Sequence, residues 1–381
     1  MFKTLKLKSN YRPDYVFIVC ALLLTVFGLV MLSSASSDLG KINFNDTYYY
    51  LKHQIIYGLG LGAIGFLFAF FIDYRFWQKI AAPLLILNLF LLVLVFTPLG
   101  SSHAGASRWL DLGFTSVQPA ELLKFSFIVY LAAWLAPRAK GANKKKRQKD
   151  FWAGYFPFLI ISGLVAVLII MQRSTSAVAI IMAAGLLVYF VSGARLSFIF
   201  SAIFLGLLGF ALLVSYSPYR LDRVETYLKM VTGSESIDYE SSAFHVNQSL
   251  ISMGSGGFWG VGFGQSTAKF KRLPEPISDS IFAVISEELG FIGTASLIGI
   301  FGVFFVKGFI IAKKSAGQFA KLIIVGFVSV MAIQTFINIA AISGLIPLTG
   351  VPLPFISYGG TSLAVFLTMA GVIGNISKYS N

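Results

Sequence analysis

The chain consists largely of ten apolar blocks, each about 17 to 25 residues long, separated by charged or Pro- and Gly-containing segments. A helix of that length crosses the ~30 Å hydrocarbon core of a bilayer. A mean hydropathy of +0.79, with only 12% charged residues, excludes a soluble enzyme. We therefore predict an all-α polytopic membrane protein with one domain over residues 1–381. The ten expected transmembrane helices cover residues 15–32, 55–72, 80–96, 119–136, 153–171, 177–191, 196–214, 281–306, 322–343 and 362–377.

The distribution of basic residues predicts how these helices are oriented. The chain has 30 Lys and Arg against 16 Asp and Glu, and most of the basic residues fall in alternate loops if the N-terminus lies inside. The positive-inside rule then places both termini in the cytoplasm, and we interpret the first block as an uncleaved signal anchor. The basic loop 137–150 is interpreted as a topology determinant that also contacts anionic lipid headgroups, not as a nucleic-acid-binding segment.

A large extracytoplasmic loop, residues 215–279, is expected between helices 7 and 8. It holds seven of the 16 acidic residues, so any chemistry is expected there. At its end, Asp279 stands just outside a span, close in sequence to the cations Lys269, Lys271 and Arg272. This placement suits a general base for a lipid-borne substrate, and the alternative is a helix N-cap.

Three further acids are assigned supporting roles around this position. Glu275 lies in the same segment, between two prolines that stiffen it. Glu287 and Glu288 lie two turns into the following helix, where we expect one of them to neutralise a cation of the Lys269–Arg272 cluster.

Ionisable groups inside spans cost roughly 2.5–3.5 kcal/mol at a helix centre and are functional candidates. Glu121 and Lys124 share one helical face, either as a structural ion pair or with Lys124 holding an anionic headgroup and Glu121 orienting it. Arg108 is either a phosphate contact for a lipid pyrophosphate or an ordinary interfacial arginine. Trp109 beside it is expected as an aromatic-belt anchor. Arg173 is a second phosphate contact or a plain positional charge.

Residues 254–264 contain six glycines in eleven positions. They do not match G-x-G-x-x-G at any register, so they predict close backbone approach or a tight bend instead of a nucleotide site. No metal site is predicted from the residues, because His53, His103 and His245 show no ligand spacing and Cys20 is the single cysteine.

Three runs of the sequence resemble one protein family. They are GASRWLDLGFTSVQPAELLK at residues 105–124, NQSLISMGSGGFWGVGFGQSTAKFKRLPEPISDSIFAVISEELGFIG at 247–293, and GLIPLTGVPLPFISYGGTS at 344–362. On these runs the chain resembles the SEDS family, the FtsW/RodA/SpoVE group of bacterial cell-wall polymerases, over nearly its whole length. Residues 262–270 are more similar to the division branch of the family than to its elongation branch.

The resemblance implies an inverting peptidoglycan glycosyltransferase of the bacterial cytoplasmic membrane, which polymerises lipid II into β-1,4 glycan strands during septal cell-wall synthesis. It implies a class B penicillin-binding protein as partner transpeptidase, together with other membrane proteins of the division complex. It leaves a divalent cation, Mg²⁺ or Mn²⁺, open as a cofactor.

The resemblance also implies roles for individual residues. In such proteins the acid after the Leu-Pro-Glu run is essential, and it maps to Asp279, which becomes the expected general base. Arg108, Lys124 and Lys271 or Arg272 are expected to offset charge on the departing pyrophosphate.

Two departures limit what the resemblance implies. Arg173 stands where many members have an Asp, and Ile277-Ser278 stands where they have His-Thr, so the roles of that Asp and that His do not carry over.

Two other functions compete with the polymerase. One is a lipid II flippase or transporter, which requires a charge-lined passage, whereas most of the expected spans are nearly free of ionisable residues. The other is a non-catalytic division scaffold, in which Asp279 would be replaceable without loss of polymer.

Overall fold

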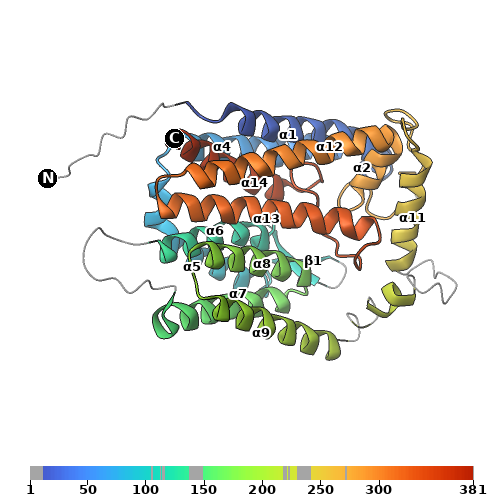
Figure 1. Cartoon of the computed structure of the whole chain (residues 1–381). Coiled ribbons are helices and arrows are strands. Elements are labelled where there is room, and N and C mark those ends of the chain that lie inside the picture. Colours follow the sequence, from blue (N-terminus) through green and yellow to red (C-terminus); the bar gives the residue numbers. More distant parts are fainter. Residues whose placement is uncertain are drawn as a thin grey trace.

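The structure is a computed structural model that describes residues 12–103, 106–111, 113, 116–136, 149–217, 221, 224–229, 242–270 and 273–380. Long helices run side by side in one bundle (Figure 1). In chain order they are α1 (Tyr15–Ala35), the continuous segment α3 (Tyr49–His53), η1 (Gln54–Gly60) and α4 (Leu61–Phe71), α5 (Arg75–Leu94), α6 (Pro119–Leu135), η3 (Phe151–Tyr155) with α7 (Phe156–Met171), α8 (Thr175–Val191), α9 (Leu196–Ser215), α12 (Ile281–Lys314), α13 (Gln318–Ile342) and α14 (Gly360–Ser377).

The predicted all-α polytopic membrane fold is confirmed in outline. Each of the ten expected spans coincides with a helix of the bundle. Among the described residues, eight helices are long and apolar enough to cross a membrane. The other two, α6 and α8, have 17 residues each, so the number of ten spans stays a prediction.

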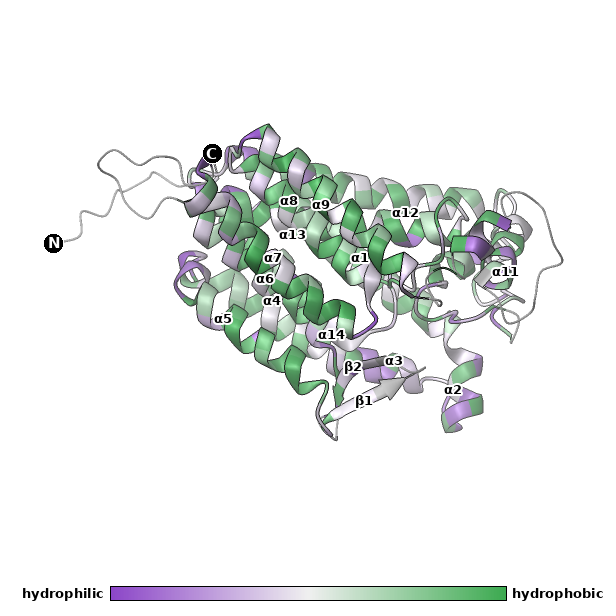
Figure 2. Ribbon diagram, turned by 90° about the horizontal axis from the view of Figure 1, so that it is seen from below, coloured by the Kyte–Doolittle hydropathy of each residue, from purple (hydrophilic) through white to green (hydrophobic). Residues whose placement is uncertain are grey.

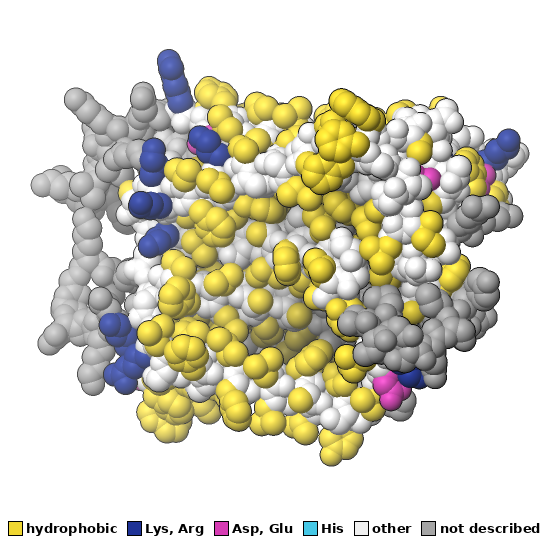
Figure 3. Space-filling view, turned by 45° about the vertical axis from the view of Figure 1, so that its right-hand side comes forward, with side chains coloured by type: hydrophobic (Ala, Val, Ile, Leu, Met, Phe, Trp, Pro, Cys, Tyr) yellow, Lys and Arg dark blue, Asp and Glu magenta, His cyan; other side chains and the backbone are white. Residues whose placement is uncertain are grey.

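The bundle has a buried centre and a lipid-exposed periphery. Most residues of α13 and α14 are buried, whereas α9 contributes few buried residues. Apolar side chains cover the middle of the outer surface (Figure 3). A helix that is apolar on every side is expected where one face packs in the bundle and the other contacts hydrocarbon.

The two ends of the bundle differ in charge and structure. The start of α1 and the end of α14 lie together, because the amide of Asp14 donates to Ser377 Oγ at 3.0 Å. Exposed Lys and Arg side chains gather at this end (Figure 3). The opposite end, which we call the loop end, carries α2 (Ser37–Phe44), α11 (Ser242–Ser255) and a small sheet (Figure 1). In Figure 2, α2 and α3 at the loop end include more hydrophilic residues than the bundle.

The sheet and α11 were not predicted. Strands β1 (Gly100–His103), β2 (Ala106–Asp111) and β3 (Ser116–Val117) form an antiparallel meander between α5 and α6. Helix α11 lies within the expected loop 215–279, most of whose acidic residues fall outside the described residues. The basic loop 137–150 also lies almost wholly outside them.

Candidate active site

A tight turn at the loop end presents Asp279. The amides of Ser278 and Ser280 both donate to the carbonyl oxygen of Glu275, at 3.2 Å each. The turn is attached to the segment before α14, because the amide of Tyr358 donates to Ile277 O at 2.8 Å and Ser357 Oγ donates to Ser278 O. The segment that carries Asp279 is therefore held by hydrogen bonds within its own turn and by hydrogen bonds to the segment before α14.

Asp279 is 8% exposed, and its carboxyl group has defined neighbours. Ser278 Oγ donates to Asp279 Oδ1 at 2.9 Å. A Cβ atom at Gly350 would lie 3.6 Å from Oδ2, so the backbone of Gly350 passes close to this oxygen. The N-cap position of α12 is Ser280, not Asp279. The N-cap interpretation of Asp279 is therefore wrong.

Asn338 of α13 anchors the backbone around Asp279. Its Nδ2 donates to Asp279 O at 2.8 Å and to Val351 O at 2.7 Å, and its side chain is 1% exposed. Gln334, one turn earlier on α13, donates to Pro352 O at 2.8 Å. Asn338 thus joins the turn of Asp279 to Val351, and Gln334 on the same helical face holds the next residue, Pro352.

Replacing Asn338 by Leu should lower, at least tenfold, the activity that the family resemblance implies, the formation of glycan strands. Leu has a similar volume but leaves two buried carbonyl groups without their donor, which displaces the turn that carries Asp279. The rate is measured on lipid II. The matched control is Asn88→Leu on α5, since Asn88 is buried and its Oδ1 has no hydrogen-bond partner among the described residues. Equal rates in the two variants would contradict the role given to Asn338.

Glu275 lies in the same turn, with a left-handed backbone conformation at φ 48° between two prolines. Glu275 is exposed, but partial loss of hydration beside the turn, and then the negative charge of Asp279, raise the pKa of Glu275 above its ordinary value, against smaller opposing effects of Ser278 and His245. His245 of α11 contacts Ser280 through Nε2 and Oγ at 2.5 Å. Glu275 and Asp279 are thus electrostatically coupled acids.

The raised pKa of Glu275 predicts a pH dependence of stability. The folded state binds this proton more tightly than the unfolded state, so the free energy of unfolding falls as the pH rises from about 4.5 through the raised pKa. The Glu275→Gln variant has no carboxyl group at this position, so this fall in the free energy of unfolding with pH is absent. The melting temperature of the variant should therefore exceed that of the wild type increasingly across this window and by a constant amount above it. Parallel curves at all pH values would show that Glu275 is not perturbed.

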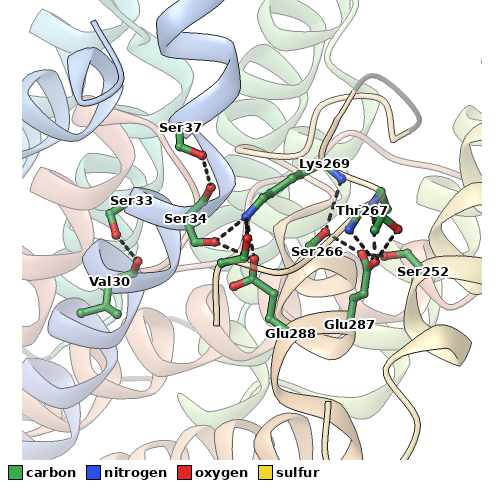
Figure 4. Close-up of polar contacts among 12 residues, drawn as sticks. Val30, Ser33, Ser34, Ser37, Ser252, Ser266, Thr267, Lys269, Glu287 and Glu288 are labelled. Carbon is green, nitrogen blue, oxygen red and sulfur yellow. Dashed lines mark hydrogen bonds and ion pairs between the residues drawn. The ribbon is translucent and has the colours of Figure 1, made fainter. Parts of the chain in front are cut away.

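Glu287 and Glu288 point in different directions from the first turns of α12 (Figure 4). Glu288 pairs with Lys269 at 3.0 Å, as predicted for one of these two acids. Glu287 instead accepts hydrogen bonds from α11 and from residues that precede Lys269. Its donors are Ser252 Oγ at 2.9 Å, Ser266 Oγ at 2.6 Å, Thr267 N at 2.9 Å, Thr267 Oγ1 at 3.2 Å and Ala268 N at 3.4 Å.

The glycine-rich segment packs its backbone against a break in α12. At Gly290 the backbone leaves the helical conformation, with φ 64° and ψ −165°. In an unbroken helix the amides of residues 291 and 292 would donate to the carbonyls of Glu287 and Glu288. Instead those amides donate to Gly257 O and Phe258 O, at 3.0 and 3.3 Å, and those carbonyls accept from Val261 N and Gly262 N, at 3.0 Å each.

This contact confirms the predicted close backbone approach. A Cβ atom at Gly256 would lie 2.1 Å from Ser286 O, and one at Gly260 would lie 2.3 Å from Glu288 O. A side chain at either position therefore collides with the backbone of α12.

The predicted ion pair of Glu121 and Lys124 is formed inside the bundle. Lys124 Nζ contacts Glu121 Oε1 at 2.5 Å and donates to Gln334 Oε1 at 2.6 Å. Lys124 is 1% exposed, and its ammonium also lies 5.7 Å from the centre of the Phe366 ring. The pair therefore joins α6 to α13 and α14 below the turn of Asp279. This agrees with the interpretation of Glu121 and Lys124 as a structural ion pair.

Arg108 and Arg173 come together at the loop end, but through the backbone of the second residue. Arg108 on β2 donates from Nε to Gln172 O at 3.2 Å and from Nη2 to Arg173 O at 2.6 Å. Arg173 has φ 57° in the turn between α7 and α8. Trp109 lies half-buried beside Arg108 on β2. Lys271 and Arg272 lie outside the described residues, so their predicted roles are not located.

Sequence reasoning missed several residues around Asp279. Gln334 and Asn338 could have been found, because amides four residues apart in an apolar helix carry the same desolvation cost that singled out Glu121. His245 and Gly350 belong to no sequence pattern that would have indicated a position near Asp279. Among the described residues no three His, Cys, Asp or Glu side chains form a group that could hold a metal ion, and a divalent cation stays a prediction.

Comparisons with known proteins point to one family over nearly the whole chain. The family model for FtsW, RodA and SpoVE, described as cell cycle protein, matches residues 14–381. Stage V sporulation protein E of Bacillus subtilis is 38% identical over 370 residues, which cover 97% of this chain and 98% of that protein. The probable peptidoglycan glycosyltransferase FtsW of Geobacter sp. strain M18 is 34% identical over 365 residues, 96% of each chain.

Solved structures share the fold. A chain from a study of how a peptidoglycan synthase complex coordinates polymerization and crosslinking has a TM-score of 0.75 at 24% identity, covering 97% of this chain and 99% of its own. The rod shape determining protein RodA of Thermus thermophilus has a TM-score of 0.69 at 23% identity, covering 97% and 98%.

Proposed function

This chain belongs to the FtsW/RodA/SpoVE family of cell cycle proteins, and on that premise we propose that it is a peptidoglycan glycosyltransferase that polymerises lipid II into β-1,4 glycan strands. The observation that carries the proposal is the carboxyl group of Asp279, held at the loop end of the bundle by the turn at 275–280 and by Asn338. A fixed acid above the apolar spans suits a substrate whose sugars lie outside the membrane and whose tail lies within it.

In the proposed reaction Asp279 acts as general base. It takes the proton from the 4-hydroxyl of the acceptor GlcNAc, and the freed oxygen attacks the anomeric carbon of the donor MurNAc. Undecaprenyl pyrophosphate leaves with the electrons of the broken bond, so a single displacement converts the α-linked donor into a β-1,4 linkage. Ser278 Oγ donates to Asp279 Oδ1 and thereby orients the carboxyl group that takes the proton.

The pyrophosphate develops negative charge as it leaves, and basic residues at the loop end offset it. We assign this role to Arg108 and to Lys271 or Arg272. Lys124 acts at a distance, because it is buried and bonded to Glu121 and Gln334, which in turn fixes Pro352 O near the turn of Asp279.

The proposal includes a partner and a place. A class B penicillin-binding protein crosslinks the strands as they form, and the similarity to a chain of a peptidoglycan synthase complex supports such a pairing. The chain lies in the bacterial cytoplasmic membrane at the division septum with both termini inside, and the FtsW relatives support the division role.

Polymer formation tests this function. The purified chain, with its cognate class B partner, is incubated with lipid II, and products are separated on a gel. A ladder of glycan strands, absent with the partner alone, is the expected result. If no strands form with the partner present, the chain is a transporter or a scaffold, which translocation of labelled lipid II in liposomes would distinguish.

A further inference from the structure

Lys269 sits in a closed polar cluster that does not reach the solvent (Figure 4). Its ammonium donates to Ser34 Oγ at 2.9 Å, to Gly264 O at 2.8 Å and to Glu288 Oε1 at 3.0 Å. The side chains of Lys269 and Glu288 are 2% and 0% exposed. All three donors of the ammonium are therefore used by the protein itself, so Lys269 is not positioned to bind a substrate phosphate.

The pair joins three separate parts of the chain. Ser34 lies near the end of α1, Lys269 follows the glycine-rich segment, and Glu288 lies just before the break in α12. Ser34 Oγ also donates to Glu288 Oε1 at 2.6 Å, so the serine contacts both members of the pair. We call Ser34, Lys269 and Glu288 the latch.

The latch closes the piece of chain that contains Asp279. Asp279 stands about midway between Lys269 and Glu288 in the sequence, so their ion pair joins the segment before Asp279 to the helix that follows it. Before Asp279 the amide of Leu273 donates to Ala268 O at 2.9 Å, and Leu273 is 4% exposed. Fixing the chain on both sides of Asp279 limits the positions that the residues between can take.

Stability alone does not account for this arrangement. A buried ion pair recovers little more free energy than the removal of its charges from water costs, and well-packed apolar residues of similar volume are often at least as stable. Within the described part of the chain, Glu288 Oε2 also has no hydrogen-bond partner, which adds to that cost. The pair does, however, fix how α1, the segment at Lys269 and α12 lie relative to one another.

We propose that Lys269 and Glu288, bridged by Ser34, are positioning residues that hold Asp279 in its reactive place. This inference rests on the proposed function, because it assigns Asp279 the catalytic role. It makes two claims: loss of the latch lowers turnover without lowering affinity for lipid II, and it loosens residues 273–280 without unfolding the bundle.

The decisive variant is Lys269→Met/Glu288→Leu, which replaces the pair by apolar side chains and leaves no buried charge unpaired. Lys269→Met alone leaves the buried Glu288 carboxylate without its cation, and this single variant can fail to fold for that reason. The control is Lys52→Met, the same substitution in the exposed ion pair with Asp46 at the loop end, where Lys52 is 62% exposed. Each full-length protein is measured in detergent with its partner.

We expect the double variant to melt at or above the wild-type temperature, with kcat lowered on the order of 100-fold and KM for lipid II within about twofold. Amide hydrogen exchange should rise in residues 273–280 and stay unchanged in α13 and α14, and Lys52→Met should match the wild type in every measurement. Wild-type kcat or wild-type exchange at 273–280 in the double variant would overturn the proposal. If the wild type itself makes no strands, the proposed function fails, while the exchange measurement still decides whether the latch holds the segment.

Discussion

Replacing Asp279 by Asn should reduce glycan polymerisation by roughly 10²–10⁴-fold, the contribution expected of a general base, while the chain still folds. Asn keeps the size of the side chain, and its carbonyl oxygen can still accept the hydrogen bond from Ser278 Oγ. The amide nitrogen cannot take a proton from a sugar hydroxyl. Strand formation from lipid II measures the effect, and the melting temperature of the variant shows whether it folds.

Asp46→Asn is the matched control for this change. Asp46 is an exposed acid at the loop end, paired with Lys52 at 2.7 Å, so its replacement should leave polymerisation unchanged. Wild-type activity in Asp279→Asn would remove this residue from the reaction. The base would then be sought first at Glu275, because Glu287 and Glu288 are already bonded inside the protein.

Replacing Gly290 by Ala adds a single methyl group, yet it should strongly lower the free energy of unfolding of the chain. Only glycine adopts the backbone conformation at φ 64° and ψ −165° without strain. For any other residue, this conformation alone costs about 1–3 kcal/mol. The added Cβ would also lie 2.3 Å from Gly260 N, a backbone atom that cannot rotate away. The glycine-rich segment would have to leave the break, with loss of its four backbone hydrogen bonds.

The same helix supplies the control for Gly290. Gly299→Ala adds a methyl group at a position of α12 with no atom within 4 Å, where Ala is the better helix former. Thermal unfolding followed by size-exclusion chromatography should show a lower midpoint for Gly290→Ala and an unchanged or higher one for Gly299→Ala. Equal midpoints would mean that the break in α12 does not depend on glycine.

The bundle itself was predictable because membrane spans depend on local hydropathy. Each expected span is a helix, and the ion pair of Glu121 and Lys124 followed from helical spacing within one block. The sheet was missed because residues 100–117 are rich in Gly and Ser and alternate poorly, so their pairing depends on neighbours distant in sequence. The number of ten spans stays a prediction, since α6 and α8 have only 17 residues each.

The site was predictable only in part, for a physical reason. The acid at 279 and the ion pair of Glu288 with a cation could be expected from charge and position. The contact between the glycine-rich segment and Gly290 is made by backbone atoms, which leave no complementary side-chain pattern in the sequence. Asn338 reaches Asp279 from a helix 59 residues away, and only the folded bundle brings them together.

The break in α12 has a consequence for how the protein is made. Backbone groups that face hydrocarbon without a partner cost several kcal/mol each, and α12 supplies no partners of its own at residues 287, 288, 291 and 292. Its donors and acceptors come from residues 257–262. The backbone of α12 at the break is therefore satisfied only when the glycine-rich segment is docked, so this helix and that segment must assemble as one unit.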